Sequence, residues 1–198
     1  GVRLRAERAA ECALEIPPEA PPRPVLSPLE TPGGVIFELA EEIPKDRPAL
    51  RRILIEYPDG RERADVTGML RSGSAFLPFE LGGESGSALL LEFSARPDQT
   101  LRLWFEIAAP VGVRRNEPDA ETEPPRTLVW ELSGLGIVAP VQDDTRSLSR
   151  SGYVTLPLTE AWQPDAEGVY RLTVRQIEGG CEERVRLTGI SAGRYRAV

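Results

Sequence analysis

The feature that most restricts the fold is a succession of short apolar or alternating runs between residues 35 and 190, each bounded by residues that favour turns. In one run, Leu101, Leu103 and Phe105 alternate with other residues, which is the period of a half-buried strand. Little helical pattern lies between the runs, so the crossover helices of a parallel sheet are missing. The sequence therefore predicts an all-β protein: an antiparallel β-sandwich of jelly-roll or immunoglobulin-like type, with a barrel as the alternative. The runs are 35–40, 51–57, 61–70, 75–81, 88–94, 100–108, 127–132, 136–141, 152–158, 169–177 and 183–190.

The first 34 residues have a different pattern. Residues 1–16 carry apolar residues at helical spacing and are followed by Pro17 and Pro18, which predicts a lead-in helix. An extended lead-in strand is the alternative. Residues 17–34 contain seven prolines, and such a segment cannot pair as a central strand. We expect a linker or a strap across the domain, with a ligand for a proline-binding module as the functional alternative.

Three parts of the chain are expected. Residues 1–34 are the lead-in and Pro-rich linker, residues 35–87 are rich in hairpins, and residues 88–198 form the β-sandwich. Within the second part, Pro58-Asp59-Gly60 predicts a turn between two strands. Whether residues 35–87 form a small subdomain of their own stays open.

The charge of the chain excludes some classes of partner. Its net charge is −7, and Lys45 is the only lysine among its basic residues. Binding to nucleic acid needs a net positive face, and so does binding to an anionic membrane surface, so we expect neither partner. Membrane insertion is not expected either, because no apolar run approaches the roughly 20 residues of a membrane span. Cys12 and Cys181 lie too far apart for a zinc motif, and free thiols are favoured over a disulfide.

Catalysis is not expected, because the chain contains no histidine. Its absence removes the commonest general base and excludes Ser-His-Asp and Cys-His sites. Paired carboxylates, as in glycosidases, remain an alternative, and Asp143 with Asp144 is one candidate pair. Neighbours on a strand point to opposite faces, however, so such a pair rarely works together. We expect a protein that is not an enzyme and needs no cofactor.

The Asp143-Asp144-Thr145 sequence predicts a turn in which an Asp side chain satisfies backbone N–H groups. A calcium site is the alternative, although two acids and one hydroxyl fall short of the six to eight oxygen ligands that calcium prefers. We expect no metal here.

The tryptophans divide into core and surface candidates. Trp130 lies inside an apolar run and is predicted to be core. Trp104 is out of phase with its apolar neighbours Leu103 and Phe105, so it is predicted to face the other side of its sheet and to be a surface contact. Trp162 lies in the loop-like stretch TEAWQPD and is the second surface candidate. Leu54 also points outward by its phase, and outward apolar residues can mark an interface.

The order of motifs from residue 88 to residue 190 resembles that of baseplate assembly proteins of contractile phage tails and phage-tail-like injection systems. The resemblance begins with LLLEFSARPDQTLRLWFEIA, two apolar strands joined by a Pro-containing turn. The chain departs from the family pattern at three places. It has Leu132 where an aromatic residue is usual, Ile137-Val138 where a Trp follows, and Tyr170 in place of a Trp in the last strand. The later motifs are Val129-Trp130-Glu131-Leu132, Asp143-Asp144-Thr145, Leu148-Ser149-Arg150-Ser151-Gly152 and Tyr170-Arg171-Leu172-Thr173-Val174-Arg175.

This resemblance implies a structural role without turnover. The protein would be a component of the baseplate, with other baseplate, hub or sheath subunits as partners. It would be cytoplasmic during assembly and then part of the particle. In this interpretation Trp130 packs in the core. Asp143, Asp144 and Thr145 form a turn. Ser151 and Gly152 lead from that turn into the next strand. The alternative is a carbohydrate-binding or adhesive sandwich, with or without calcium, in which Trp104, Trp162 and the 143–145 turn would be exposed and would converge.

Overall fold

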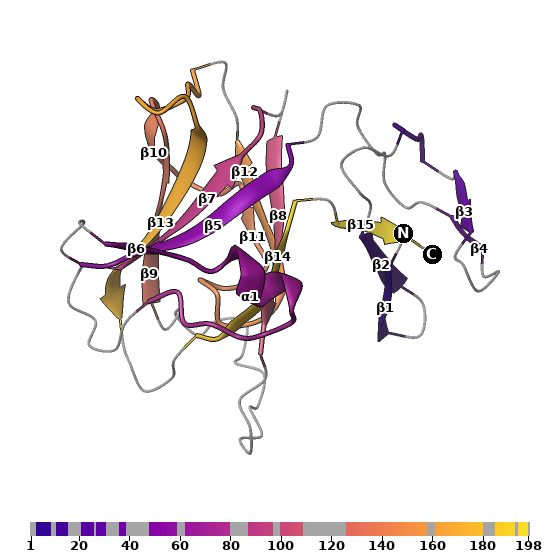
Figure 1. The fold of residues 1–198 in the computed structure, drawn as a ribbon. Coiled ribbons are helices and arrows are strands. Elements are labelled where there is room, and N and C mark those ends of the chain that lie inside the picture. Colours follow the sequence, from indigo (N-terminus) through magenta and orange to yellow (C-terminus); the bar gives the residue numbers. More distant parts are fainter. Residues whose placement is uncertain are drawn as a thin grey trace.

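The computed structural model describes residues 3–8, 11–15, 21–25, 27–30, 36–38, 48–58, 62–79, 87–96, 100–108, 126–157, 161–179, 185–192 and 194–197. In this part of the chain an antiparallel sheet of six strands packs face to face with an antiparallel sheet of four (Figure 1). The all-β antiparallel sandwich predicted from the sequence is therefore confirmed. Among the described residues, no helix is long and apolar enough to cross a membrane.

The larger sheet has the strand order β10-β9-β13-β7-β5-β6. The hairpin predicted on either side of the Pro58 turn is present as β5 and β6, in which Leu54 pairs with Asp65. β5 also pairs with β7, so residues 50–65 belong to the same sheet as the strands after residue 88. The strands are β5 (Leu50–Glu56), β6 (Arg63–Asp65), β7 (Ala88–Phe93), β9 (Arg126–Leu132), β10 (Gly136–Val138) and β13 (Tyr170–Gly179).

The smaller sheet has the order β11-β12-β8-β14. Its strands are β8 (Thr100–Ile107), β11 (Gln142–Asp143), β12 (Gly152–Pro157) and β14 (Leu187–Ser191). From β7 to β14 the chain passes repeatedly from one sheet to the other, because β7, β9, β10 and β13 lie in the larger sheet. Such crossings tie the two layers of a sandwich together.

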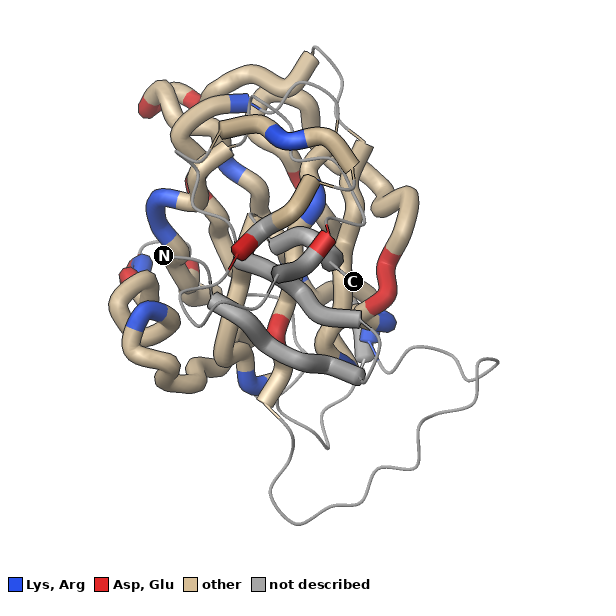
Figure 2. Tube along the Cα trace, turned by 90° about the vertical axis from the view of Figure 1, so that its right-hand side faces the viewer, with Lys and Arg blue, Asp and Glu red and all other residues tan. Residues whose placement is uncertain are grey.

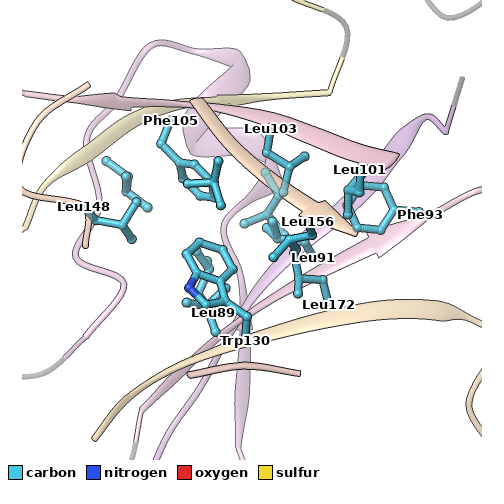
Figure 3. Close-up of a cluster of buried hydrophobic side chains, with 14 of the residues drawn as sticks. Leu89, Leu91, Phe93, Leu101, Leu103, Phe105, Trp130, Leu148, Leu156 and Leu172 are labelled. Atoms are coloured by element: carbon cyan, nitrogen blue, oxygen red, sulfur yellow. The ribbon is translucent and has the colours of Figure 1, made fainter. Parts of the chain in front are cut away.

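The core lies between the two sheets and is filled by alternate residues of their strands. Leu103 and Phe105 of β8 approach it from the smaller sheet, and Leu89 and Trp130 approach it from the larger one (Figure 3). Burial of one large apolar side chain contributes roughly 1.5–3 kcal/mol to stability. A slip of one residue in register would turn a whole set of these side chains outward, so the core fixes the pairing of the strands.

At one edge of the sandwich the helix α1 (Thr67–Arg71) lies near β5 and β14 (Figure 1). The run predicted as a strand at 61–70 is therefore only partly a strand, because the chain turns into α1 after β6. The strand predicted at 75–81 is also wrong: its described residues form a single bridge, between Phe76 and Leu187. Pro78 has no N–H to donate, so the pairing does not continue along the chain.

Segments from both ends of the sequence form a separate three-stranded antiparallel sheet of β1 (Arg3–Arg8), β2 (Glu11–Glu15) and β15 (Arg194–Ala197). The helix predicted over residues 1–16 is therefore wrong, and the extended alternative is confirmed for the described residues. These residues form strands because β2 pairs with β15. The spacing of apolar residues in a local segment does not reveal a partner strand so distant in the sequence. This sheet lies outside the sandwich, on the side of β8 and β14 (Figure 1).

The Pro-rich segment contributes one short strand. β3 (Pro28–Glu30) pairs with β4 (Ile36–Glu38), which confirms the strand predicted at 35–40 over three of its residues. Pro28 is the first residue of β3, a position where a missing N–H is tolerated. Several positions singled out in the sequence lie outside the described residues: Pro17, Pro18, Lys45, Asp59-Gly60 and Cys181; the side chain of Cys12 is likewise not described.

Candidate functional site

The turn that follows β11 is built around the carboxylate of Asp143. Its Oδ1 accepts hydrogen bonds from the backbone N–H of Thr145 at 2.9 Å and from the Thr145 hydroxyl at 2.5 Å. Its Oδ2 accepts the N–H of Ser147 at 2.9 Å, and the Thr145 hydroxyl oxygen accepts the N–H of Leu148 at 2.9 Å. This is the Asx-type turn predicted from the sequence. Both carboxylate oxygens of Asp143 are used inside the loop.

The same turn contains three consecutive left-handed residues. Arg146, Ser147 and Leu148 have φ angles of 51°, 55° and 59°. L-residues visit this conformation mostly as single residues, at a cost of roughly 1–2 kcal/mol each. The hydrogen bonds to Asp143 and the burial of the Leu148 side chain in the core offset that cost. Sequence reasoning missed this feature, because no glycine marks these three positions.

Asp144 uses its carboxylate differently from its neighbour. Gln142 Nε2 donates to both carboxylate oxygens, at 3.0 and 2.9 Å, and Arg150 Nε donates to the Asp144 backbone oxygen at 2.8 Å. The two adjacent carboxylates therefore have separate partners and do not converge on one site. Within the described residues, no three acidic, Cys or His side chains are grouped so that they could hold a metal ion.

The step from the turn into β12 depends on Ser151 and Gly152. Ser151 Oγ accepts the backbone N–H of Ile107 at 2.9 Å, which satisfies a donor at the end of β8. A Cβ atom at Gly152 would lie 2.8 Å from the carbonyl carbon of Asp144 and 2.9 Å from its oxygen. Glycine is needed because the backbones approach so closely. The pair therefore admits β12 beside β8, as the sequence predicts.

Trp130 and Tyr170 both pack within the domain. The Trp130 ring is buried and meets Phe105 of the opposite sheet in a T-shaped contact, with ring centroids 5.9 Å apart. It therefore joins the two layers, in agreement with its predicted core role. Tyr170 opens β13 and is half-buried, and its ring lies edge-on to Trp162 with centroids 5.5 Å apart.

The surface role predicted for Trp162 is wrong. Its side chain is 0% exposed and packs edge-on against Phe93 at a centroid distance of 5.9 Å, as well as against Tyr170. The indole N–H donates to Ser133 Oγ at 3.1 Å, so its one polar atom is satisfied in the interior. A Trp in a loop-like sequence is drawn into the core because it buries a large apolar area there.

Trp104 lies on the outer face of the smaller sheet, as its phase predicts, but it is only 8% exposed. Its ring meets Tyr153 of β12 in a T-shaped contact at 4.9 Å, and the Arg102 guanidinium lies 3.8 Å from the centroid of the Tyr153 ring. A ring covered in this way offers no flat stacking surface, so the predicted surface contact through Trp104 is wrong. Trp104 and Trp162 lie on opposite sides of the smaller sheet and do not converge.

Sequence reasoning also missed a charge network on the outer face of the larger sheet. Arg171 of β13 lies at its centre, with a side chain only 11% exposed. Burial lowers the pKa of Arg171, but hydrogen bonds to Glu167 and Glu92 and the charge of Asp165 outweigh this effect and raise the pKa above its ordinary value. Arg171 therefore stays charged and pairs with three carboxylates at once. The Arg171 nitrogens lie 2.9 Å from Glu92, 2.6 Å from Asp165 and 2.8 Å from Glu167.

A second group of ion pairs lies on the same face of the larger sheet. Glu56 lies 3.0 Å from Arg63 and 3.2 Å from Arg175, its neighbours on either side. Leu54 and Leu90 lie between these ion pairs and those of Arg171, and Ala88 lies between Glu56 and Arg175; the three residues form a buried apolar cluster. Leu54 does point outward, as predicted, but it is covered. Acidic and basic positions are interspersed along the described chain (Figure 2).

Exposed apolar residues occur together at one rim of the sandwich. Ile137 of β10 is 75% exposed and Val141, just before β11, is 66% exposed. β10 and β11 are edge strands of the two different sheets, and residues 139–141 join them. The sequence run GIVAPV contains both residues, but its pattern does not distinguish this exposed pair from core.

No protein-family model matches the chain, and comparison with curated proteins finds no match. The basis for a function is therefore the set of motifs and the geometry of the chain itself.

Proposed function

We propose that this chain is a non-enzymatic structural component of the baseplate of a contractile phage-tail-like particle, acting through protein–protein contacts. Its partners would be other baseplate, hub or sheath subunits. It would be present in the cytoplasm during assembly and in the particle afterwards. The proposal starts from the resemblance of residues 88–190 to baseplate assembly proteins.

The observation that carries the proposal is that the motif residues are used inside the domain. Trp130 joins the two sheets, Asp143 and Thr145 hold the turn, and Gly152 makes room for the backbone of Asp144. These side chains stabilise the sandwich itself, and none of them is left to bind or turn over a small substrate. A motif of this kind favours a structural protein, whose function depends on its outer surface.

The same observation weighs against the carbohydrate-binding alternative. That function needs Trp104 and Trp162 exposed beside the 143–145 turn. Trp162 is fully buried, Trp104 is covered, and the Asp143 carboxylate is saturated by loop donors. These three groups are therefore not available to stack on a sugar or to complete a calcium site.

Ile137 and Val141 are the contact residues that we propose for a partner subunit. Their exposure is high for β-branched residues, and their position at a rim leaves them accessible. The edge strands beside them are very short, and Pro140 lies between them, which disfavours the addition of a partner strand. The contact would therefore be made through side chains.

The test is to isolate the tagged full-length protein from the cells that make it and to view the eluate by negative-stain electron microscopy. We expect tubes, sheaths or baseplates together with companion subunits. The double substitution Ile137→Glu with Val141→Glu should remove the companions, because it places charges in a contact that must be desolvated.

The control substitution is Met69→Glu in α1, where the side chain is also exposed but lies at a different end of the domain. It should leave the companions bound. Recovery of the wild-type protein as a clean monomer would overturn the baseplate function. Equal loss with both variants would overturn the assignment of the contact to Ile137 and Val141.

A further inference from the structure

The exposed apolar pair of Ile137 and Val141 lies between two side chains of opposite charge. Glu131 of β9 is directly opposite Ile137 of β10, so the two side chains share the outer face of the larger sheet. Val141 precedes β11 of the smaller sheet, and Arg150 lies against the turn that follows β11, where its Nε donates to the backbone oxygen of Asp144 at 2.8 Å. The order across this rim is therefore acid, apolar, apolar, base.

Both charged side chains at the rim are exposed, and neither has a partner of opposite charge within the described residues. In this part of the chain the Glu131 carboxylate accepts no hydrogen bond, and the Arg150 guanidinium reaches only a backbone oxygen. Elsewhere on the outer face of the larger sheet, Glu92 and Glu56 each lie beside two arginines. The two charges at the rim are therefore available for ion pairs with another molecule.

The order of these four residues is complementary to itself. A twofold rotation about an axis between Ile137 and Val141 places Val141 of one copy against Ile137 of the other, and Arg150 of one copy opposite Glu131 of the other. Such a symmetric contact uses the same patch on both subunits and makes each favourable interaction twice. It buries exposed apolar area at its centre and pairs charges at its periphery. A second copy of this chain therefore satisfies both the apolar and the charged groups of the rim.

We propose that the rim binds a second copy of this chain in a symmetric dimer, in which Glu131 pairs with the partner's Arg150. The inference rests on the proposed function, because it names the subunit that Ile137 and Val141 contact. The four residues form a small patch, so we expect a weak dimer whose arrangement depends on the two ion pairs.

The test is sedimentation velocity of the purified full chain over a range of protein concentrations. The wild-type protein should show a fraction of dimer that rises with concentration. Glu131→Arg should weaken the dimer about fivefold or more, because both ion pairs of the symmetric contact become repulsive, and Arg150→Glu should do the same. The combined variant, Glu131→Arg with Arg150→Glu, should dimerise as the wild type does.

A mixture of the two single variants gives the sharper result. In a mixed dimer the two substituted side chains face each other with opposite charges, and so do the unchanged Glu131 and Arg150. The mixture should therefore dimerise at concentrations at which each single variant alone is a monomer. Oligomers larger than a dimer would contradict the symmetric contact.

The control variants are Glu62→Arg, just before β6, and Arg51→Glu in β5. They make the same changes of charge at exposed positions toward the edge of the larger sheet that is opposite β10. Each should change the dissociation constant of the dimer less than about twofold. If circular dichroism shows that Glu131→Arg is misfolded, Glu131→Lys tests the same ion pair.

The inference would be overturned by wild-type protein that stays monomeric at every concentration, by equal effects of the rim and control variants, or by a mixture of single variants that stays monomeric. These results differ from failure of the proposed function. A monomeric chain that still brings down companion subunits, which Ile137→Glu with Val141→Glu removes, would assign the rim to a different subunit. A dimer recovered without companions would keep the inference and overturn the baseplate function.

Discussion

The hydroxyl of Ser133 accepts the indole N–H of Trp162 at 3.1 Å, and this contact attaches the segment after residue 160 to the end of β9. The same hydroxyl accepts the backbone N–H of Arg171 at 3.1 Å and donates to the backbone oxygen of Gln163 at 2.8 Å. One small side chain therefore satisfies polar groups from three parts of the chain. It also places the buried Trp162 ring beside Phe93 and Tyr170.

Ser133→Ala should lower the free energy of unfolding by about 2 kcal/mol, because it leaves a buried indole N–H and a backbone N–H without an acceptor. Urea denaturation followed by Trp fluorescence measures the change. Ser72→Ala removes an exposed hydroxyl that donates only to Met69 and lies near Ser74, and it should cost less than about 0.5 kcal/mol. Similar losses in the two variants would contradict this role of Ser133.

Asp143→Asn should destabilise the protein by about 2 kcal/mol. The substitution replaces one of the two carboxylate oxygens by an NH2 group, so a donor then faces the backbone N–H of Ser147 or that of Thr145. Asp144→Asn is the matched control, since that carboxylate is bound only by Gln142 among the described contacts, and its effect should be under about 0.5 kcal/mol. Chemical denaturation compares the two, and an equal loss would show that the Asp143 bonds do not hold the turn.

Gly152→Ala should destabilise the protein by roughly 1–3 kcal/mol, because the new methyl group overlaps the backbone of Asp144 and the strands must shift. Gly68→Ala is the control. Nothing lies within 4 Å of a Cβ at Gly68, which is in α1, so this change should stabilise the protein by up to about 1 kcal/mol. Thermal melting of both variants tests the prediction, and a neutral Gly152→Ala would refute the close approach.

Stability should fall in acid partly through Asp65. The pKa of Asp65 is lowered, mainly by hydrogen bonds from the Thr67 side chain and backbone, while burial acts in the opposite direction. A carboxyl whose folded pKa is depressed adds stability that is fully present above its unfolded value of 3.8 and is lost as the pH falls through the folded value. The difference in unfolding free energy between wild type and Asp65→Asn should therefore be constant near neutral pH and shrink below pH 3.8. A difference that stays constant in acid would exclude this contribution.

The sequence predicts those parts of the fold that are determined by local alternation. Leu103, Phe105 and Trp104 fall on the predicted faces of β8, because the side that is buried must be apolar at every second position. The turn at Asp143 is predictable for a similar reason, since its hydrogen bonds join residues two to four apart.

Features that depend on distant contacts were not predictable. The exposure of Trp104 and Trp162 depends on which parts of the fold cover them, and the neighbouring sequence does not show which parts these are. The ion pair between Arg171 and Glu92 joins strands that are adjacent only in the folded sheet. Residues 3–8 and 11–15 belong to a stretch with helical spacing, yet they are strands, because β15, far away in the sequence, pairs with β2.

The pairing of β2 with β15 has a consequence for the order of folding. β15 follows every strand of the sandwich in the sequence, so during synthesis the third strand of this sheet is made after β5 to β14. Closing so long a loop costs conformational entropy, and pairings of high sequence separation form slowly. The sheet of β1, β2 and β15 is therefore expected to form last, on a sandwich that is already folded.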